Sequence, residues 1–341
     1  MLKKTIRRLG ALAMVLAMAV SVFAVNASAA ETGVDQLTIT KNVPTGTNVH
    51  APNTTFAFTV EAGEAGLKYD DYDVIQGAAG DWTMGAPVSV TKASQTATTA
   101  TGTTTMTLNR TYTAPGIYSY KVVETAGDYD GIKYSTDGKN VLVFVEYDEA
   151  TNAYVVKKAV VVTIADKVAT VAEAKGDLTF TNEYETHKLT VTKKVEGNLG
   201  DRSKKFNFTI TITSADGVVG EKYWVVPNGG TGYDVTTAAN EDGTVTATVT
   251  VELADAQSVE IYGLSPEDSY DVTEAATEYT ISYDGNKSGA MGNADKTTIV
   301  TNTKNTSTPG GVIMTIAPYA LMLVVAGAFA VVFLSRRNRA E

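Results

Sequence analysis

The chain has 341 residues, of which 44% are hydrophobic, and its formal net charge is −10 at pH 7. This length allows two domains with separate cores, and the negative charge argues against binding to nucleic acid. The sequence contains no cysteine and only two histidines, which excludes a disulfide framework, a cysteine nucleophile and the usual zinc sites. We therefore expect no metal and no cofactor.

Residues 1–30 have the three parts of a secretory signal peptide. Four basic residues come first, an apolar run follows from Leu9 to Val25, and Ala27-Ser28-Ala29 supplies small residues for cleavage. We therefore expect an exported protein that is cleaved after Ala29 or Ala30. An uncleaved amino-terminal membrane anchor is the alternative.

A strand-like segment then occurs twice in the chain. Residues 37–43 alternate apolar and polar side chains, as a half-buried strand does, but Lys41 falls on the apolar face. Residues 189–195 repeat the pattern, and Lys193 again falls in phase with the apolar residues. A lysine stem could lie along an apolar surface once by chance, whereas two lysines in register across a repeat need a common explanation.

Three further segment pairs extend the repeat. They are Phe56–Val60 with Phe206–Ile210, Tyr120–Glu124 with Tyr270–Glu274, and Leu178–Asn182 with Thr298–Asn302. These alternating, threonine-rich runs predict an all-β fold with two tandem domains, residues 31–185 and 186–304. The first domain is longer between its glutamate and its asparagine, and a predicted hairpin at 140–147 and 154–164 fills part of the difference.

Each predicted domain buries one lysine, one glutamate and one asparagine. Glu124, Glu274, Asn182 and Asn302 follow apolar residues in phase, as the two lysines do. Unpaired, such groups would cost several kcal/mol each, so we expect them to meet. Burial favours a neutral lysine, which is a nucleophile, and the asparagine carbonyl is its electrophile. The glutamic acid would hydrogen-bond that carbonyl and shuttle the proton, leaving a Lys–Asn isopeptide bond. A simple Lys–Glu salt bridge is the alternative.

The carboxyl-terminal end has three parts. A spacer with the motif Thr308-Pro309-Gly310-Gly311 (residues 305–311) precedes an uncharged apolar segment (312–335) and a basic tail (336–341). A helix of this length would reach about 35 Å, enough to cross a bilayer core of roughly 30 Å. The arrangement resembles the cell-wall sorting signal of Gram-positive surface proteins, which sortases cut. A permanent single-span anchor is the alternative.

The whole set of features resembles the backbone pilins of streptococci and related Gram-positive bacteria. The resemblance implies immunoglobulin-like β-sandwich domains of the CnaB type. It also implies cross-links from Lys41 to Asn182 and from Lys193 to Asn302, with Glu124 and Glu274 as the catalytic residues. In this family a sortase joins the carboxyl end of one subunit to a lysine of the next, and Lys175 occupies the acceptor position.

The sortase-related residues leave alternatives open. Lys167 is the second candidate acceptor, and both lysines could be solvated loop residues. Cleavage would fall between Gly310 and Gly311, although the family normally has threonine where Gly310 stands. The segment Val43-Pro44-Thr45-Gly46 matches the usual motif better, but no apolar helix follows it, and we interpret it as a turn that ends a strand.

These features predict a structural protein, the shaft subunit of a sortase-assembled pilus on the cell wall. Its membrane-anchored precursor would have the sortase, neighbouring subunits, peptidoglycan and a host surface ligand as partners. A wall-anchored adhesin that does not polymerise is the alternative. An enzyme is not expected, because the lysine, glutamate and asparagine would react once, with each other, and never turn over.

Overall fold

The computed structural model describes residues 34–171, 178–285 and 287–306, together with 322, 325 and 326. The predicted signal peptide, Lys175, Gly310, Gly311 and the basic tail lie outside these residues, as does nearly all of segment 312–335. Within the described residues, no helix is both long and apolar enough to cross a membrane.

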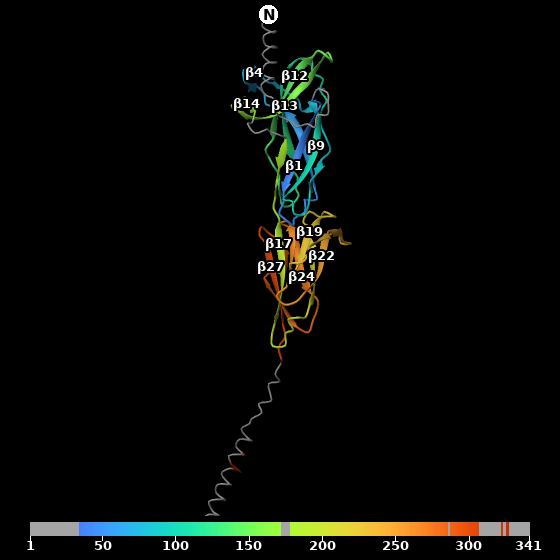
Figure 1. Ribbon diagram of the computed structural model, residues 1–341, viewed down its shortest axis with the longest axis vertical. Helices are drawn as coiled ribbons and strands as arrows, with labels where there is room; N and C mark the ends of the chain where they lie inside the picture. The colour runs from blue at the N-terminus through green and yellow to red at the C-terminus, as the bar shows by residue number, and fades with distance from the viewer. Residues whose placement is uncertain (1–33, 172–177, 286, 307–321, 323–324, 327–341) are drawn as a thin grey trace, which may run out of the picture.

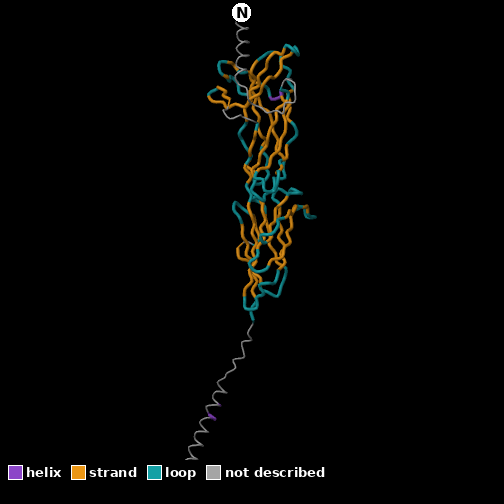
Figure 2. The backbone as a smooth tube through the Cα atoms, in the orientation of Figure 1, coloured by secondary structure: helices purple, strands orange, loops and turns teal. Residues whose placement is uncertain are grey.

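Almost all of the regular secondary structure in the described residues is β-strand, which confirms the predicted all-β class. Two β-sandwich units, residues 34–186 and 187–306, follow each other along the long axis of a rod (Figure 1). Most strands run along that axis in both units (Figure 2).

The first unit has a short 3-10 turn at Ala79–Asp81. Its described strands are β1 (Gln36–Pro44), β2 (Thr55–Ala62), β3 (Lys68–Tyr69), β4 (Tyr72–Asp73), β5 (Ile75–Gln76), β6 (Trp82–Met84), β7 (Val88–Ser89), β8 (Thr91–Lys92), β9 (Thr99–Leu108), β10 (Gly116–Thr125), β11 (Ile132–Lys133), β12 (Lys139–Asp148), β13 (Ala153–Ala165), β14 (Val168–Val171), β15 (Thr179–Thr181) and β16 (Glu183–Tyr184).

Two sheets of the first unit enclose its main core. One has the order β15-β1-β9-β6, with β8 added at β9, and the other has the order β4-β3-β14-β13-β12-β10-β2-β7, with β5 added at β10. Alternate residues of each strand point between the sheets, including Ile39, Phe56, Tyr120, Val143 and Phe180. A small ribbon of β11 and β16 lies beside them.

The larger sheet is buried on its outer face as well. Val141 and Val143 of β12 point into the main core, whereas Leu142 and Phe144 belong to a second cluster on the opposite side. That cluster also contains Ala169 of β14 and is packed against tyrosines of β3 and β4. The predicted hairpin corresponds to β12 and β13. This hairpin and the short strands that cover it contribute to the greater length of the first unit.

The described strands of the second unit are β17 (His187–Glu196), β18 (Phe206–Thr213), β19 (Lys222–Pro227), β20 (Tyr233–Thr236), β21 (Ala238–Ala239), β22 (Val245–Leu253), β23 (Ser258–Leu264), β24 (Ser269–Glu274), β25 (Thr280–Gly285), β26 (Ser288–Ala290) and β27 (Lys296–Thr303). They form two sheets, with the orders β20-β19-β23-β17-β27-β25 and β21-β22-β18-β24-β26, around a single core cluster.

In each unit the first strand lies beside the strand that leads to or carries the asparagine, and the two strands run parallel. In the first unit β1 pairs with β15, and Lys41 lies opposite Phe180. In the second unit β17 pairs with β27, and Lys193 lies opposite Val300. Each lysine is therefore opposite the residue two positions before the asparagine of its set, so lysine and asparagine share a face of the sheet.

The segment after β1 is a turn, as the sequence predicted. β1 ends at Pro44, and Val49 donates a backbone hydrogen bond of 3.3 Å to the carbonyl of Gly46. Val43 and Thr45 are buried and anchor this turn, whereas Pro44 and Gly46 are exposed.

Backbone and side-chain hydrogen bonds join the two units. Tyr129 donates its hydroxyl proton to Glu221 over 2.6 Å. The backbone nitrogen of Asp130 donates to both carboxylate oxygens of Asp216, at 3.0 and 3.1 Å, and the carboxylate of Asp130 accepts from the backbone of Glu267. The segment 128–131 thus serves as a contact between the units.

Two carboxyl groups are buried beside this junction. Glu221 is 4% exposed and Asp268 is 1% exposed. Tyr223 donates its hydroxyl to Asp268, and the backbone nitrogens of Ser265 and Ala215 do the same. Burial, with the nearby negative charge of Glu221, raises the pKa of Asp268 to about 7.

Candidate functional site

The first site lies between the two sheets of the first unit. Lys41 comes from β1, Glu124 from the end of β10, and Asn182 follows β15 directly. The Nζ atom of Lys41 donates to Oε2 of Glu124 over 2.8 Å, and Nδ2 of Asn182 donates to Oε1 of Glu124 over 2.7 Å. The three residues are 0%, 8% and 1% exposed, so the contacts are closed to water.

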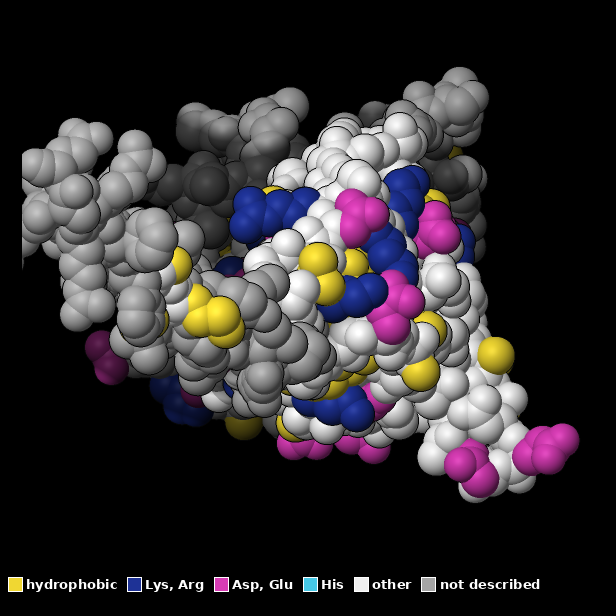
Figure 3. All heavy atoms as spheres, turned by 90° about the horizontal axis from the view of Figure 1, so that it is seen from below, with side chains coloured by type: hydrophobic (Ala, Val, Ile, Leu, Met, Phe, Trp, Pro, Cys, Tyr) yellow, Lys and Arg dark blue, Asp and Glu magenta, His cyan; other side chains and the backbone are white. Residues whose placement is uncertain are grey.

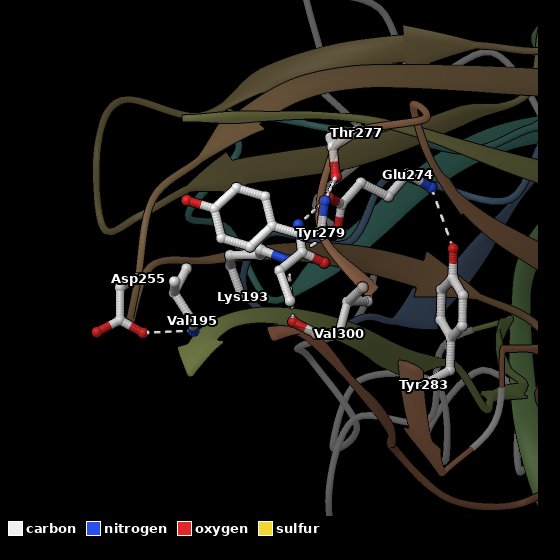
Figure 4. Close-up of polar contacts among 9 residues, drawn as sticks. Lys193, Val195, Asp255, Glu274, Thr277, Tyr279, Tyr283 and Val300 are labelled. Atoms are coloured by element: carbon white, nitrogen blue, oxygen red, sulfur yellow. Dashed lines mark hydrogen bonds and ion pairs between the residues drawn. The ribbon is translucent and has the colours of Figure 1, made fainter. Parts of the chain in front are cut away.

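The second site repeats this arrangement. Lys193 Nζ donates to Oε2 of Glu274 over 2.8 Å, and Asn302 Nδ2 donates to Oε1 of Glu274 over 2.5 Å. Lys193 also reaches the backbone carbonyl of Val300 at 3.3 Å. Figure 4 shows its side chain pointing toward Glu274 and Val300. The structure thus brings together all six residues that the sequence predicted would meet.

Strand register explains why the two sites match. Each lysine and asparagine come from parallel neighbours in one sheet, and the glutamate comes from the facing sheet. Glu124 is the register partner of Phe58, and Glu274 is the register partner of Phe208. These phenylalanines belong to the repeated Phe-x-Phe segments, so the sequence repeat preserves the position of the glutamate opposite the lysine and the asparagine.

An aromatic ring lies close to each lysine amine. Lys41 Nζ lies 4.7 Å from the ring centroid of Phe56, and Lys193 Nζ lies 4.4 Å from that of Phe206. The sequence comparison paired these two residues but did not assign them a place in the site. Their signal was available, because each stands two residues before a second buried phenylalanine in an alternating strand.

The surroundings of the lysines change their acidity. Burial lowers the pKa of Lys41 and of Lys193, and the hydrogen bond to the neighbouring glutamate opposes that shift only in part. A larger share of neutral amine follows, and a neutral amine has the lone pair that attacks an amide carbon. Both sites therefore hold a nucleophile, an amide electrophile and a carboxyl group that bridges them.

The two asparagine carbonyls differ in their partners. Oδ1 of Asn182 accepts a hydrogen bond of 2.9 Å from the backbone nitrogen of Ser135. Oδ1 of Asn302 is buried without a hydrogen-bond partner among the described residues. In both sites the glutamate faces the amide nitrogen, whereas the sequence argument had placed it against the carbonyl oxygen. Sequence reasoning did not identify Ser135, which lies in a segment without periodicity.

The remaining predicted residues are not part of these sites. Lys175, Gly310 and Gly311 lie outside the described residues. Lys167 lies in the turn between β13 and β14, where its half-exposed side chain forms an ion pair of 2.5 Å with Glu64. No group of three or more potential ligands among the described histidines, aspartates and glutamates could hold a metal ion.

Comparison with known proteins places this arrangement in a family. A family model described as a domain of unknown function (DUF7601) matches residues 187–304. A pilin of Streptococcus pyogenes serotype M1 is 31% identical over 333 residues, which cover 89% of this chain and 91% of that pilin. The pilus tip adhesin Cpa of Streptococcus pyogenes is 35% identical over 115 residues, which are 33% of this chain and 15% of the adhesin.

Solved structures agree with the sequence relatives. A crystal structure of the major pilin from Streptococcus pyogenes has a TM-score of 0.56 and 26% sequence identity, and the match covers 81% of this chain and 100% of that chain. Another major pilin of the same organism has a TM-score of 0.58 at 21% identity and shows the same fold, with 81% of this chain and 99% of that chain covered. The chain therefore belongs to the family of Gram-positive pilins, the structural subunits of surface pili.

Proposed function

We propose that this pilin is the repeating shaft subunit of a sortase-assembled pilus, and that each of its two domains closes its own Lys–Asn isopeptide bond. The observation that carries the proposal is the duplicated site. In each unit a buried lysine and a buried asparagine bond to the two oxygens of one buried glutamate. A salt bridge would need only the lysine and the glutamate, whereas the bond also needs the asparagine amide.

The position of the bonds suits a protein under tension. Each bond would join the first strand of a domain to the end of a parallel neighbour, β15 in the first domain and β27 in the second. Force that enters one of them would pass through a covalent link instead of the hydrogen bonds of the sheet. We assign the domains to residues 31–185 and 186–304, so that each contains one complete cross-link.

Assembly would use the ends of the rod. The sortase would cut between Gly310 and Gly311, release the membrane segment, and join Gly310 to Lys175 of the next subunit. The final subunit would be transferred to peptidoglycan. At the lower end of the second unit, basic and acidic side chains lie next to each other (Figure 3), with ion pairs such as Lys204–Glu278 and Arg202–Asp255. This balance limits repulsion between negatively charged subunits that meet end to end.

The second candidate is a wall-anchored adhesin that does not polymerise. The match of 115 residues to a pilus tip adhesin and the glycine at position 310 favour it. The match covers only 15% of that adhesin, so it supports a shared domain more strongly than a shared role.

Co-expression with the cognate sortase separates the two functions. A shaft subunit should give a ladder of covalent multimers on a denaturing gel, and Lys175→Arg should leave only monomer with both internal bonds intact. Lys167→Arg is the matched control and should polymerise as the wild type does. Normal polymerisation of Lys175→Arg would move the acceptor elsewhere, and a wild type that stays monomeric would favour the adhesin.

A further inference from the structure

The carbonyl oxygen of Asn182 has a donor that its counterpart lacks. Ser135 N–H donates to Oδ1 of Asn182 over 2.9 Å, while Oδ1 of Asn302 has no partner among the described residues. The lysine–glutamate contact is 2.8 Å in both sites, and Lys193 additionally reaches the carbonyl oxygen of Val300. The difference at the asparagine concerns the atom on which negative charge develops when an amine attacks the amide.

The fold explains this difference. In the first unit β11 pairs with β16, Lys133 opposite Glu183, and the chain then leaves the ladder without further strand structure until β12. The N–H of Ser135 is thereby free to point at a side chain. In the second unit β25 pairs with β27 and Ile281 lies opposite Asn302. Ladder N–H groups lie in the plane of the sheet, whereas the asparagine side chain points out of that plane into the core.

We propose that the backbone N–H of Ser135 is the oxyanion donor of the first cross-linking site and that it accelerates closure of the Lys41–Asn182 bond. This inference rests on the proposed isopeptide chemistry. A donor fixed in a site closed to water stabilises a developing oxyanion without reorganising during the reaction.

The step balances without any further reactant. The lone pair of neutral Lys41 Nζ forms a bond to Cγ of Asn182, and the carbonyl electron pair moves to Oδ1, where Ser135 N–H holds it. Glu124 accepts one proton from Nζ, and its carboxyl group returns one proton to Nδ2. The carbonyl then re-forms, the bond from Cγ to Nδ2 breaks, and ammonia leaves. Glu124 is unchanged at the end.

The test removes one N–H group and leaves the side chains of the site in place. The full chain is produced in pulse-labelled cells and digested at successive chase times. Mass spectrometry then measures the cross-linked peptide pair of Lys41 and Asn182 against the unlinked peptides. Ser135→Pro deletes the N–H, and Ser135→Ala keeps it. Replacing the amide of residue 135 by an ester also deletes the N–H, without the proline ring.

We expect Ser135→Ala to close the first bond at the wild-type rate, and the proline and ester variants to close it about 100-fold more slowly. The Lys193–Asn302 pair in the same molecules should close normally in every variant, which shows that the chain has folded. Wild-type rates in the ester variant would overturn the proposal, even if proline slowed the reaction. A wild type that forms neither cross-linked pair would overturn the isopeptide chemistry itself.

Discussion

Lys41 of β1 lies opposite Phe180 of the parallel strand β15. Phe180 stands two residues before Asn182, which shares the carboxylate of Glu124 with Lys41. Lys193 has the same relation to Val300 and Asn302. A parallel ladder puts residues two apart on the same face. The diagonal from lysine to asparagine is therefore fixed by register, and the glutamate needs only to arrive from the facing sheet.

Mass measures the cross-links directly. Each closed bond should make the protein lighter than its formula by one ammonia, about 17 Da by the stoichiometry of amine attack on an amide. Glu124→Ala should keep the ammonia mass in the first domain and lose it only in the second. Glu274→Ala should keep it in the second domain and lose it only in the first. Glu61→Ala, at an exposed glutamate that pairs with Lys121, is the control and should keep both losses. A wild type at its full formula mass would contradict the assignment of all six residues.

Loss of the first bond should lower stability strongly. In the chain-entropy model a cross-link that closes a loop of roughly 100 residues contributes ~4.7 kcal/mol. Lys41→Ala should therefore lower the melting temperature by roughly 10 °C or more and make the first domain sensitive to protease. Asn182→Ala also prevents the bond but keeps the Lys–Glu ion pair. Similar losses in both variants, measured by calorimetry, would assign the effect to the bond; a loss in Lys41→Ala alone would assign it to the unpaired glutamate.

Period-two alternation is what made the six site residues predictable. It marks a polar residue in an apolar phase, and the repeat shows that the phase is not accidental. Ser135 could not be found this way, because residues 134–138 have no periodicity and reach Asn182 only through the pairing of β11 with β16. The outer cluster around Leu142 and Phe144 was missed for another reason: a continuous apolar run does not show which strands cover its second face.

The junction depends on contacts between units that have no counterpart within either repeat. Tyr129→Phe should delete the hydrogen bond to buried Glu221 and cost about 1–3 kcal/mol, because a buried acceptor loses a donor. We expect a protease to cleave the variant faster between the two units, while both internal cross-links are retained. Gel electrophoresis of samples taken during the digestion measures the cleavage rate. Tyr233→Phe, which removes a hydroxyl from a partly exposed ring, is the control. Equal proteolysis of the two variants would show that the junction does not rely on Tyr129.

Lowering the pH should stabilise the folded protein near the same junction, because Asp268 takes up a proton there. The pKa of this carboxyl rises from its ordinary value of 3.8 to about 7 in the folded protein, because burial, together with the charge of Glu221, disfavours the ionised form. Between those values the folded chain keeps a proton that the unfolded chain releases. Its contribution to stability is therefore fully present below about pH 3.8 and is lost as the pH rises through about 7.

The melting temperature of the wild type should consequently fall as the pH is raised from 4 to 7, and this part of the fall should end above 7. Asp268→Asn cannot take up that proton, so its melting temperature should depend less on pH across the same interval. Burial also raises the pKa of Asp216, which acts in the same direction and remains in the variant. The decisive quantity is thus the difference in melting temperature between the two proteins. A difference that stays constant from pH 4 to 8 would mean that Asp268 does not titrate there.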